Sequence, residues 1–152
     1  MHSWTLAILG LSTAAGAQMP GAGDGFCGEL ARVISAAAET PPFASLPGFD
    51  ERGEVAMFGF ARGCGQGRIP GGEPYFACHR QLPPLELRVA ALAARIARCL
   101  PSAERLADSR GGSLFRQHVV RFRIPGVTIE LAEGGWATRG GGQVALTIQR
   151  DR

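Results

Sequence analysis

The segment PPLELRVAALAARIARCLP, residues 83–101, has the most regular apolar period in the chain. Its apolar side chains recur every three or four residues, which is the spacing of the buried stripe of an α-helix. Pro84 suits the first turn of such a helix, and Pro101 ends it. The stripe consists of Leu85, Val89, Leu92, Ile96, Cys99 and Leu100. Because an isolated helix of this length is marginal in water, the segment predicts a helix that a sheet covers on its apolar side.

The length of the chain, 152 residues, predicts one domain with a single core. All 16 basic residues are arginine, and lysine and asparagine are absent from the sequence, which is typical of a GC-rich bacterial genome. The formal net charge is only +3, because 13 acidic residues are spread among the arginines. Nucleic-acid-binding domains usually concentrate their positive charge in a stripe and exceed this balance. Charge and composition therefore argue against nucleic acid as a partner.

The first 17 residues, MHSWTLAILGLSTAAGA, have the pattern of a signal peptide. They are apolar over residues 4–11 and end in Ala-Gly-Ala, the small-x-small pattern of a signal-peptidase site. A membrane anchor is the alternative, but the apolar run is well short of the roughly 20 residues needed to span a bilayer. We therefore predict a signal peptide over residues 1–17, a flexible leader over 18–25 and a single domain over 26–152. The mature protein is expected to be periplasmic or secreted, with no membrane span.

Four cysteines remain after this cleavage: Cys27, Cys64, Cys78 and Cys99. An even number of cysteines in an exported protein predicts disulfides, with three pairings open. A zinc site is disfavoured, because no two of these cysteines are closer than 14 positions. If the turn between two predicted strands is centred on Gly71, Cys64 lies opposite Cys78 at a separation that a disulfide can bridge. This register predicts the bonds Cys64–Cys78 and Cys27–Cys99. The second joins the start of the first helix to the end of the second, as expected if the two helices lie antiparallel on one sheet face.

A first helix is predicted from Phe26 to Glu39, where apolar residues follow one helical face before Pro41 and Pro42 end the pattern. Turn-forming residues then separate segments with strand-like composition or alternation. The strands are predicted over residues 54–62, 74–82, 114–124, 126–133 and 143–150. The predicted fold class is α+β in the order α-β-β-α-β-β-β, an antiparallel sheet of about five strands with two helices packed on one face, stabilised by disulfides.

Two histidines outside the leader are the candidates for acid–base chemistry. His79 shares a predicted strand face with Tyr75 and Gln81, and a Tyr75/His79 pair could act as a general acid and base or form part of a metal site. No carboxylate on that strand orients the imidazole, however. His118 shares the face of Val120, which predicts a hydrogen-bonded histidine at the edge of the core.

Sequence motifs for cofactors and catalysis are weak. Residues 23–28 match G-x-G-x-x-G, but a signal peptide rather than a buried strand precedes them, so a dinucleotide site is rejected. The sequence contains no G-x-S-x-G, H-E-x-x-H or C-x-x-C. Asp50, Glu51 and Glu54 are the candidates for the paired carboxylates of sugar hydrolysis. They lie in or beside one loop, however, where acidic residues serve solubility. We therefore assign no catalytic residue, cofactor or metal ion.

The C-terminal strands and the last hairpin carry the candidate recognition surface. Arginine and tryptophan are enriched in interaction hot spots. The candidate residues are Arg116, Arg121, Arg123, Trp136 and Arg139.

The order of features resembles uncharacterised small exported proteins of GC-rich bacteria. These features are a signal peptide, a helix with one cysteine, a cysteine-bearing hairpin, a helix ending in Arg-Cys-Leu-Pro and C-terminal strands. The resemblance implies location and fold but no activity. We predict a non-catalytic binding or interaction domain of the cell envelope, with an envelope or extracellular protein or ligand as its partner. The alternative is a small hydrolase or other enzyme that uses His79. The identity of the partner and the oligomeric state stay open.

Overall fold

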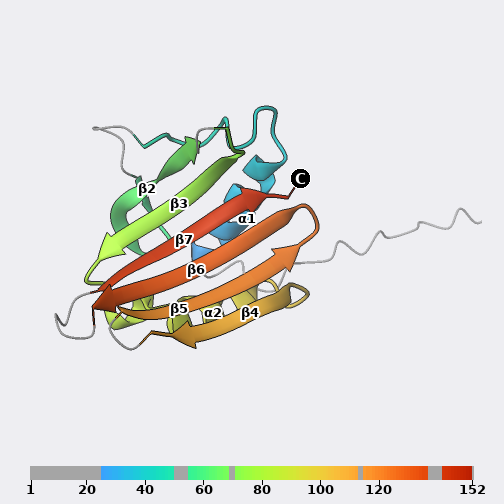
Figure 1. The fold of residues 1–152 in the computed structure, drawn as a ribbon. Helices are drawn as coiled ribbons and strands as arrows, with labels where there is room; N and C mark the ends of the chain where they lie inside the picture. Colours follow the sequence, from blue (N-terminus) through green and yellow to red (C-terminus); the bar gives the residue numbers. More distant parts are fainter. Residues whose placement is uncertain (1–24, 50–54, 69–70, 113–114, 137–141, 152) are drawn as a thin grey trace, which may run out of the picture.

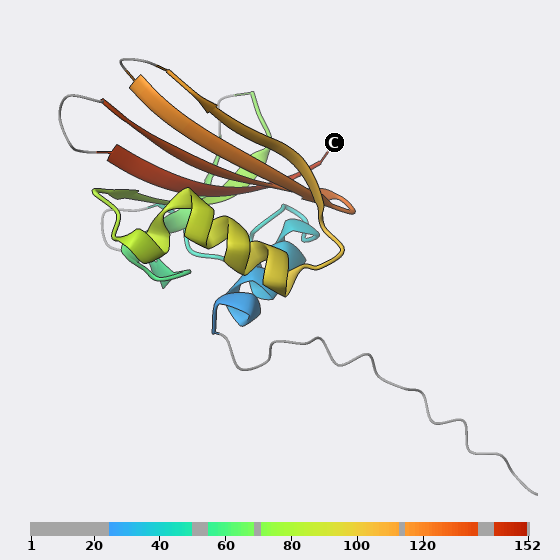
Figure 2. The same ribbon diagram turned by 90° about the horizontal axis from the view of Figure 1, so that it is seen from below.

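The computed structural model describes residues 25–49, 55–68, 71–112, 115–136 and 142–151. In it, two helices lie on one side of a seven-stranded sheet, and no described helix lies on the other side (Figure 1; Figure 2). The elements in chain order are α1 Gly25–Ala37, β1 Val55–Met57, β2 Phe60–Arg68, β3 Pro74–Gln81, the 3-10 helix η1 Leu85–Leu87, α2 Val89–Cys99, β4 Glu104–Gly111, β5 Phe115–Ile124, β6 Val127–Trp136 and β7 Gly142–Arg150.

The sheet combines two groups of strands that α2 separates along the chain. The strands before α2 lie in the order β1-β2-β3, and those after it lie in the order β7-β6-β5-β4, with every neighbouring pair antiparallel. β3 joins the two groups, because it pairs with β7 from Tyr75–Gln149 to Gln81–Gln143. The last strand of the chain therefore lies in the middle of the sheet (Figure 1).

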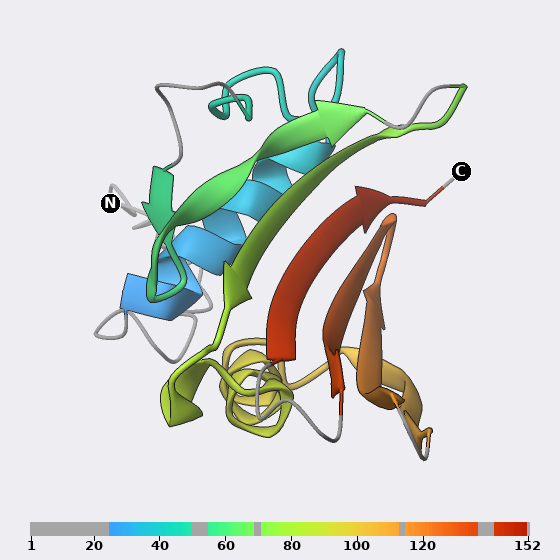
Figure 3. The same ribbon diagram turned by 60° about the vertical axis from the view of Figure 1, so that its left-hand side comes forward.

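The helices cross rather than lie side by side. α1 contacts β7, and α2 contacts β5 and β6. Figure 3 looks nearly along the axis of α2 and sees α1 from its side, so the two axes run in different directions. The expected antiparallel arrangement of the helices is therefore wrong, although both lie on the same side of the sheet. A twisted sheet presents differently directed surfaces at its two ends, and each helix follows the strands that it covers.

One apolar core lies between the sheet and the helices. Phe76, Ile148, Ile129 and Phe122 form a row across β3, β7, β6 and β5, and none of them is more than 3% exposed. From the helix side, Leu92 of α2 reaches the same core and is fully buried. Burial of each such side chain is worth roughly 1.5–3 kcal/mol. The alternating pattern of the strands therefore decides which face the helices cover.

Both predicted disulfides are present. Cys27 at the start of α1 is joined to Cys99 at the end of α2, across a sequence separation of 72. Cys64 of β2 lies opposite Cys78 of β3 and is bonded to it, with 4.0 Å between their Cα atoms. The hairpin is centred as predicted, because Arg68 pairs with Pro74 around the turn. No described cysteine is free.

The prediction of about five strands is wrong, because the sheet has seven. The segment predicted as one strand over residues 54–62 contains β1, a turn at Phe58 and Gly59, and the start of β2. The segment SAERLADSRGG, in which the sequence predicts no strand, contains β4; Ala107 is half-buried, and the other residues of the strand are exposed. An edge strand with no buried face lacks the apolar alternation by which strands are recognised.

The second helix begins later than predicted. Pro84 precedes η1, and α2 starts only at Val89. Val89, Leu92 and Ile96 are buried as expected, but Leu85 is 81% exposed and does not belong to the buried stripe. The first helix agrees with its prediction to within two residues at its C-terminal end.

The predicted signal peptide, residues 1–17, and nearly all of the predicted leader lie outside the described residues. Within the part of the chain that the structure describes, neither helix combines the length and the apolar character needed to cross a membrane.

Candidate functional site

The open face of the sheet carries the polar side chains of the alternating strands. Along β5, Phe122 is buried against the helices, whereas Arg121 and Arg123 are exposed on the opposite face. The same alternation applies to β6, where Ile129 is buried between the half-buried residues Thr128 and Glu130. Because side chains alternate between the two faces of a strand, one pattern of residues builds both the core and the open face.

Register brings these polar residues into two adjacent rows in the middle of the sheet. Residues directly opposite one another on neighbouring strands have Cβ atoms about 4.5–5.5 Å apart, so each row is a set of side-chain neighbours. The first row is Arg123–Thr128–Gln149, and the second is Arg121–Glu130–Thr147, each running across β5, β6 and β7.

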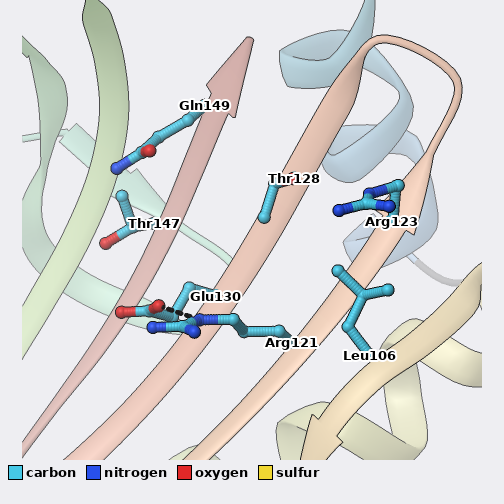
Figure 4. Close-up of a pocket in the computed structure, with 7 residues that line it drawn as sticks. All are labelled: Leu106, Arg121, Arg123, Thr128, Glu130, Thr147 and Gln149. Atoms are coloured by element: carbon cyan, nitrogen blue, oxygen red, sulfur yellow. Dashed lines mark hydrogen bonds and ion pairs between the residues drawn. The ribbon is translucent and has the colours of Figure 1, made fainter. Parts of the chain in front are cut away.

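A hollow of about 330 Å³ lies over these two rows (Figure 4). Its seventh lining residue is Leu106 of β4. The β4–β5 register shifts between Arg105 and Ala107, so Leu106 is the extra residue of a β-bulge. The bulge places an aliphatic side chain, 37% exposed, at the border of a polar surface. We call the seven lining residues the open-face hollow: Leu106, Arg121, Arg123, Thr128, Glu130, Thr147 and Gln149.

Two hydrogen bonds order the open-face hollow. Arg121 Nε donates to Glu130 Oε2 at 2.5 Å, and this ion pair spans β5 and β6. Thr128 Oγ1 donates to Asp151 Oδ1 at 2.7 Å. Figure 4 shows Arg121 and Glu130 pointing toward one another above the strands. Glu130 therefore fixes the direction of the Arg121 guanidinium.

Arg123 has a different environment. Its side chain is exposed, and no described residue forms a hydrogen bond or an ion pair with it. Its register partner on β4 is Glu104, but the two do not form an ion pair. In Figure 4 the Arg123 guanidinium lies on the Thr128 side of β5. The open-face hollow therefore contains one guanidinium held by a carboxylate and one without a protein partner in the described part of the chain.

The other end of the open face, over β2 and β3, is covered by the chain itself. Residues 47–49 run beside β2, with the Gln66 N–H donating to Pro47 O at 2.8 Å. The Phe49 ring lies 5.7 Å from the His79 ring, centroid to centroid. Gly65 permits this approach, because a Cβ there would lie 2.8 Å from the backbone nitrogen of Phe49. The loop therefore restricts the surface around His79.

The Tyr75/His79 pair does not form. The two residues share the open face of β3 but stand four residues apart, about 13 Å along a strand. Tyr75 leans over Gly67 instead, where a Cβ would come within 2.7 Å of the tyrosine hydroxyl. Among the described residues, no carboxylate is hydrogen-bonded to His79. This geometry provides neither an orienting group nor an acid–base partner for the imidazole.

His118 lies at the edge of the core on the helix side, as predicted. Its Nε2 donates to Asp108 Oδ1 across 2.9 Å, with 16% of the histidine side chain exposed. Arg105 also binds Asp108, at 2.6 Å. The hydrogen bond from His118, aided by the charge of Arg105, lowers the pKa of the Asp108 carboxyl from its ordinary value. This pair links β4 to β5 and lies on the face opposite the open-face hollow.

Of the five predicted recognition residues, the structure places Arg121 and Arg123 together in the open-face hollow. Arg116 and Trp136 belong to β5 and β6, but their side chains lie outside the described part, and so does all of Arg139.

Sequence reasoning missed five residues of the open-face hollow. The alternation of β6 and β7 placed Thr128 with Glu130, and Thr147 with Gln149, on one face of each strand. It did not give the strand register that brings these residues beside Arg121 and Arg123. Leu106 had no signal, because the sequence of β4 lacks the apolar alternation that indicates a strand.

No protein family, no curated protein and no solved structure matches this chain. The described residues contain no group of three or more histidine, cysteine or acidic side chains that could hold a metal ion.

Proposed function

We propose that this protein is an exported, non-catalytic binding domain whose ligand site is the open-face hollow. The observation that carries the proposal is the hollow itself, a concave polar surface in the middle of a sheet whose other face the core occupies. Its side chains stand on four strands of a hydrogen-bonded sheet, so their relative positions are set by backbone pairing.

The chemistry of the hollow favours binding over catalysis. Its titratable side chains are two arginines and one glutamate, and the glutamate is engaged by Arg121. A general base needs a free carboxylate or imidazole within hydrogen-bond reach of the reacting group. His79 and His118 both lie outside the hollow, and His118 is on the other face. The lining groups without a partner among the described residues are the Arg123 guanidinium, the Thr147 hydroxyl and the Gln149 amide. These groups can hydrogen-bond a ligand, but they are not general bases.

Filling the hollow tests this proposal. Thr147 lies in the middle strand of the sheet and points into the hollow (Figure 4). Thr147→Trp would fill it without disturbing the buried face. The control is Gln117→Trp, an exposed position on the same face, in the row of Gln143 rather than Thr147. Both variants and the parent would be screened by ligand-observed NMR against one library of sugars, amino acids and small organic acids.

We expect at least one compound to bind the parent and the Gln117→Trp variant but not Thr147→Trp. A library in which every binder is unaffected by Thr147→Trp would contradict the hollow as the site. Export is tested separately. The mature chain recovered from the culture medium or periplasm should begin at Gln18, and a chain beginning at Met1 in the cytoplasm would contradict export.

A further inference from the structure

We propose that the open-face hollow binds a hydroxylated carboxylate, the chemistry of a sugar acid, with the carboxylate held by Arg123 and Arg121. This inference rests on the proposed function and names the class of ligand. It follows from which groups of the hollow are already paired and which are not.

The unpaired positive charge points to an anionic group on the ligand. Arg123 has no hydrogen-bond or ion-pair partner among the described residues. Arg121 uses Nε for Glu130, which leaves its two terminal nitrogens for a ligand. The two arginines stand two positions apart on β5 and share one face. A guanidinium presents parallel donors that match the two oxygens of a carboxylate.

The surrounding carboxylates limit the ligand to a single negative charge. Within the hollow, two arginines and one glutamate leave one uncompensated positive charge. Asp151 stands beside Thr128 at one border, and Glu104 is the register partner of Arg123 at another. A polyanion lying across this surface would meet these acidic groups, and like charges in close contact repel. One carboxylate on the ligand neutralises the net positive charge of the hollow.

Hydroxyl groups suit the rest of the surface. Thr147 and Gln149 have no hydrogen-bond partner among the described side chains and offer both donors and acceptors. Glu130 and Asp151 can accept hydrogen bonds from ligand hydroxyls while keeping their own donors, because each carboxylate oxygen has two lone pairs. The site is therefore built to bind several hydroxyls beside one carboxylate.

The dimensions agree with a ligand of one or two sugar rings. Rows two residues apart along a strand are separated by about 6.6 Å, and three neighbouring strands span about 10 Å. The volume of about 330 Å³ is at the lower end of the range for small-molecule sites.

The experiment compares D-glucuronate with D-glucose, which differ only at C6, a carboxylate in glucuronate and a hydroxymethyl group in glucose. Binding to the full mature protein would be followed by backbone amide shifts in ¹H–¹⁵N NMR. Arg123→Gln removes the unpaired guanidinium, and Arg123→Lys keeps the charge without the paired donors. The control is Arg98→Gln, which changes the same charge at an exposed position of α2, on the helix side.

We expect glucuronate to shift the amides of the two rows and to bind about tenfold more tightly than glucose, the factor that corresponds to one charge-assisted hydrogen bond. Arg123→Gln should weaken glucuronate binding about tenfold and leave glucose unchanged. Arg123→Lys should lie between it and the parent, and Arg98→Gln should match the parent.

Two results would overturn the inference. If glucose and glucuronate bind the hollow equally and Arg123→Gln changes neither, the carboxylate is not recognised, whereas the hollow is still a binding site. If neither sugar shifts the amides of the two rows, the sugar-acid class is wrong. The screen with Thr147→Trp then decides separately whether the hollow binds any ligand.

Discussion

The carboxylate of Glu133, on β6, accepts a hydrogen bond from the backbone N–H of Val89, the first residue of α2, at 3.2 Å. Arg88, just before the helix, forms an ion pair with the same carboxylate. No cap residue of α2 supplies such a bond, because the side chain of Arg88 does not cap the helix. A residue 44 positions away therefore satisfies one of the unpaired donors at the helix N-terminus and places a negative charge against the helix dipole.

Replacing this long-range cap should destabilise the domain. We expect Glu133→Ala to lower the free energy of unfolding by about 1 kcal/mol, the usual value of a lost helix cap. Glu104→Ala is the control, because Glu104 is an exposed residue of the edge strand β4 with no described ion pair. Urea denaturation of the two variants measures the difference. Equal effects would show that the bond to Val89 contributes nothing.

Replacing a leucine of the second helical segment by aspartate should unfold the domain at the buried position and have little effect on stability at the exposed one. Leu92 is fully buried, so Leu92→Asp places an unpaired carboxylate in the core. The desolvation of that charge costs several kcal/mol, which is comparable with a total free energy of unfolding of about 5–15 kcal/mol. We expect this variant to be unfolded. Leu85→Asp should melt within a few degrees of the parent, since Leu85 is 81% exposed. Circular dichroism on heating distinguishes them. A folded Leu92→Asp variant would mean that α2 is not part of the core.

The two disulfides should contribute unequally. In the chain-entropy model, the 14-residue separation of Cys64 and Cys78 corresponds to roughly 3 kcal/mol, and the 72-residue separation of Cys27 and Cys99 to roughly 4–5 kcal/mol. We therefore expect the Cys27→Ser/Cys99→Ser variant to melt at a lower temperature than the Cys64→Ser/Cys78→Ser variant. Peptide mapping without reduction should recover both bonds in the parent. A peptide linking Cys78 to Cys99 would contradict the β2–β3 register.

Gly63 and Gly71 provide a matched pair for backbone strain. Both have positive φ, +90° and +70°, so alanine at either position carries about 1 kcal/mol of strain. At Gly63 the new Cβ would also lie 2.5 Å from the His79 carbonyl oxygen, whereas nothing lies within 4 Å at Gly71. We expect Gly63→Ala to destabilise the domain by roughly 1–3 kcal/mol more than Gly71→Ala, as overpacking does. Chemical denaturation of both variants tests this difference, and equal midpoints would contradict the close approach of β2 and β3.

The Asp108–His118 pair should make stability depend on pH in the acid range. Because the pKa of Asp108 is lower in the folded protein than its ordinary value, its contribution is complete above that ordinary value, about 4, and is lost as pH falls through the lowered value. The stability of Asp108→Asn should therefore fall less between about pH 5 and pH 3 than that of the parent.

A double-mutant cycle checks the cause. If the hydrogen bond from His118 lowers the pKa of Asp108, His118→Leu, which has no donor, should reproduce most of the effect of Asp108→Asn, and the double variant should add little. Urea denaturation at the two pH values measures each variant. Additive effects of the two substitutions would mean that they act independently.

Local periodicity predicted much of the fold. The stripe of Val89, Leu92 and Ile96, the first helix and the alternation of β5, β6 and β7 were all correct, because burial on one face imposes a period that neighbouring residues carry. The pairing of Cys64 with Cys78 was also predictable, since a single turn centre sets the register of a hairpin.

The remaining features depend on contacts between distant segments. β4 is bound into the sheet by its backbone bonds to β5 and has no buried face, so its side chains carry no strand pattern. Leu85 fits the helical period, but it lies in η1, before α2 begins at Val89, and its side chain is exposed.

The open-face hollow likewise combines features that the local sequence predicts with features that depend on long-range contacts. The sequence by itself determined that Arg121, Arg123, Thr128 and Glu130 leave the core, because their neighbours are apolar. Only the tertiary structure decided that the last strand pairs with β3 as well as with β6, and only the β6–β7 register places Thr147 beside Glu130. Strand order is a choice among distant backbone partners of equal hydrogen-bonding capacity, and the packing of all the apolar faces together selects one of them.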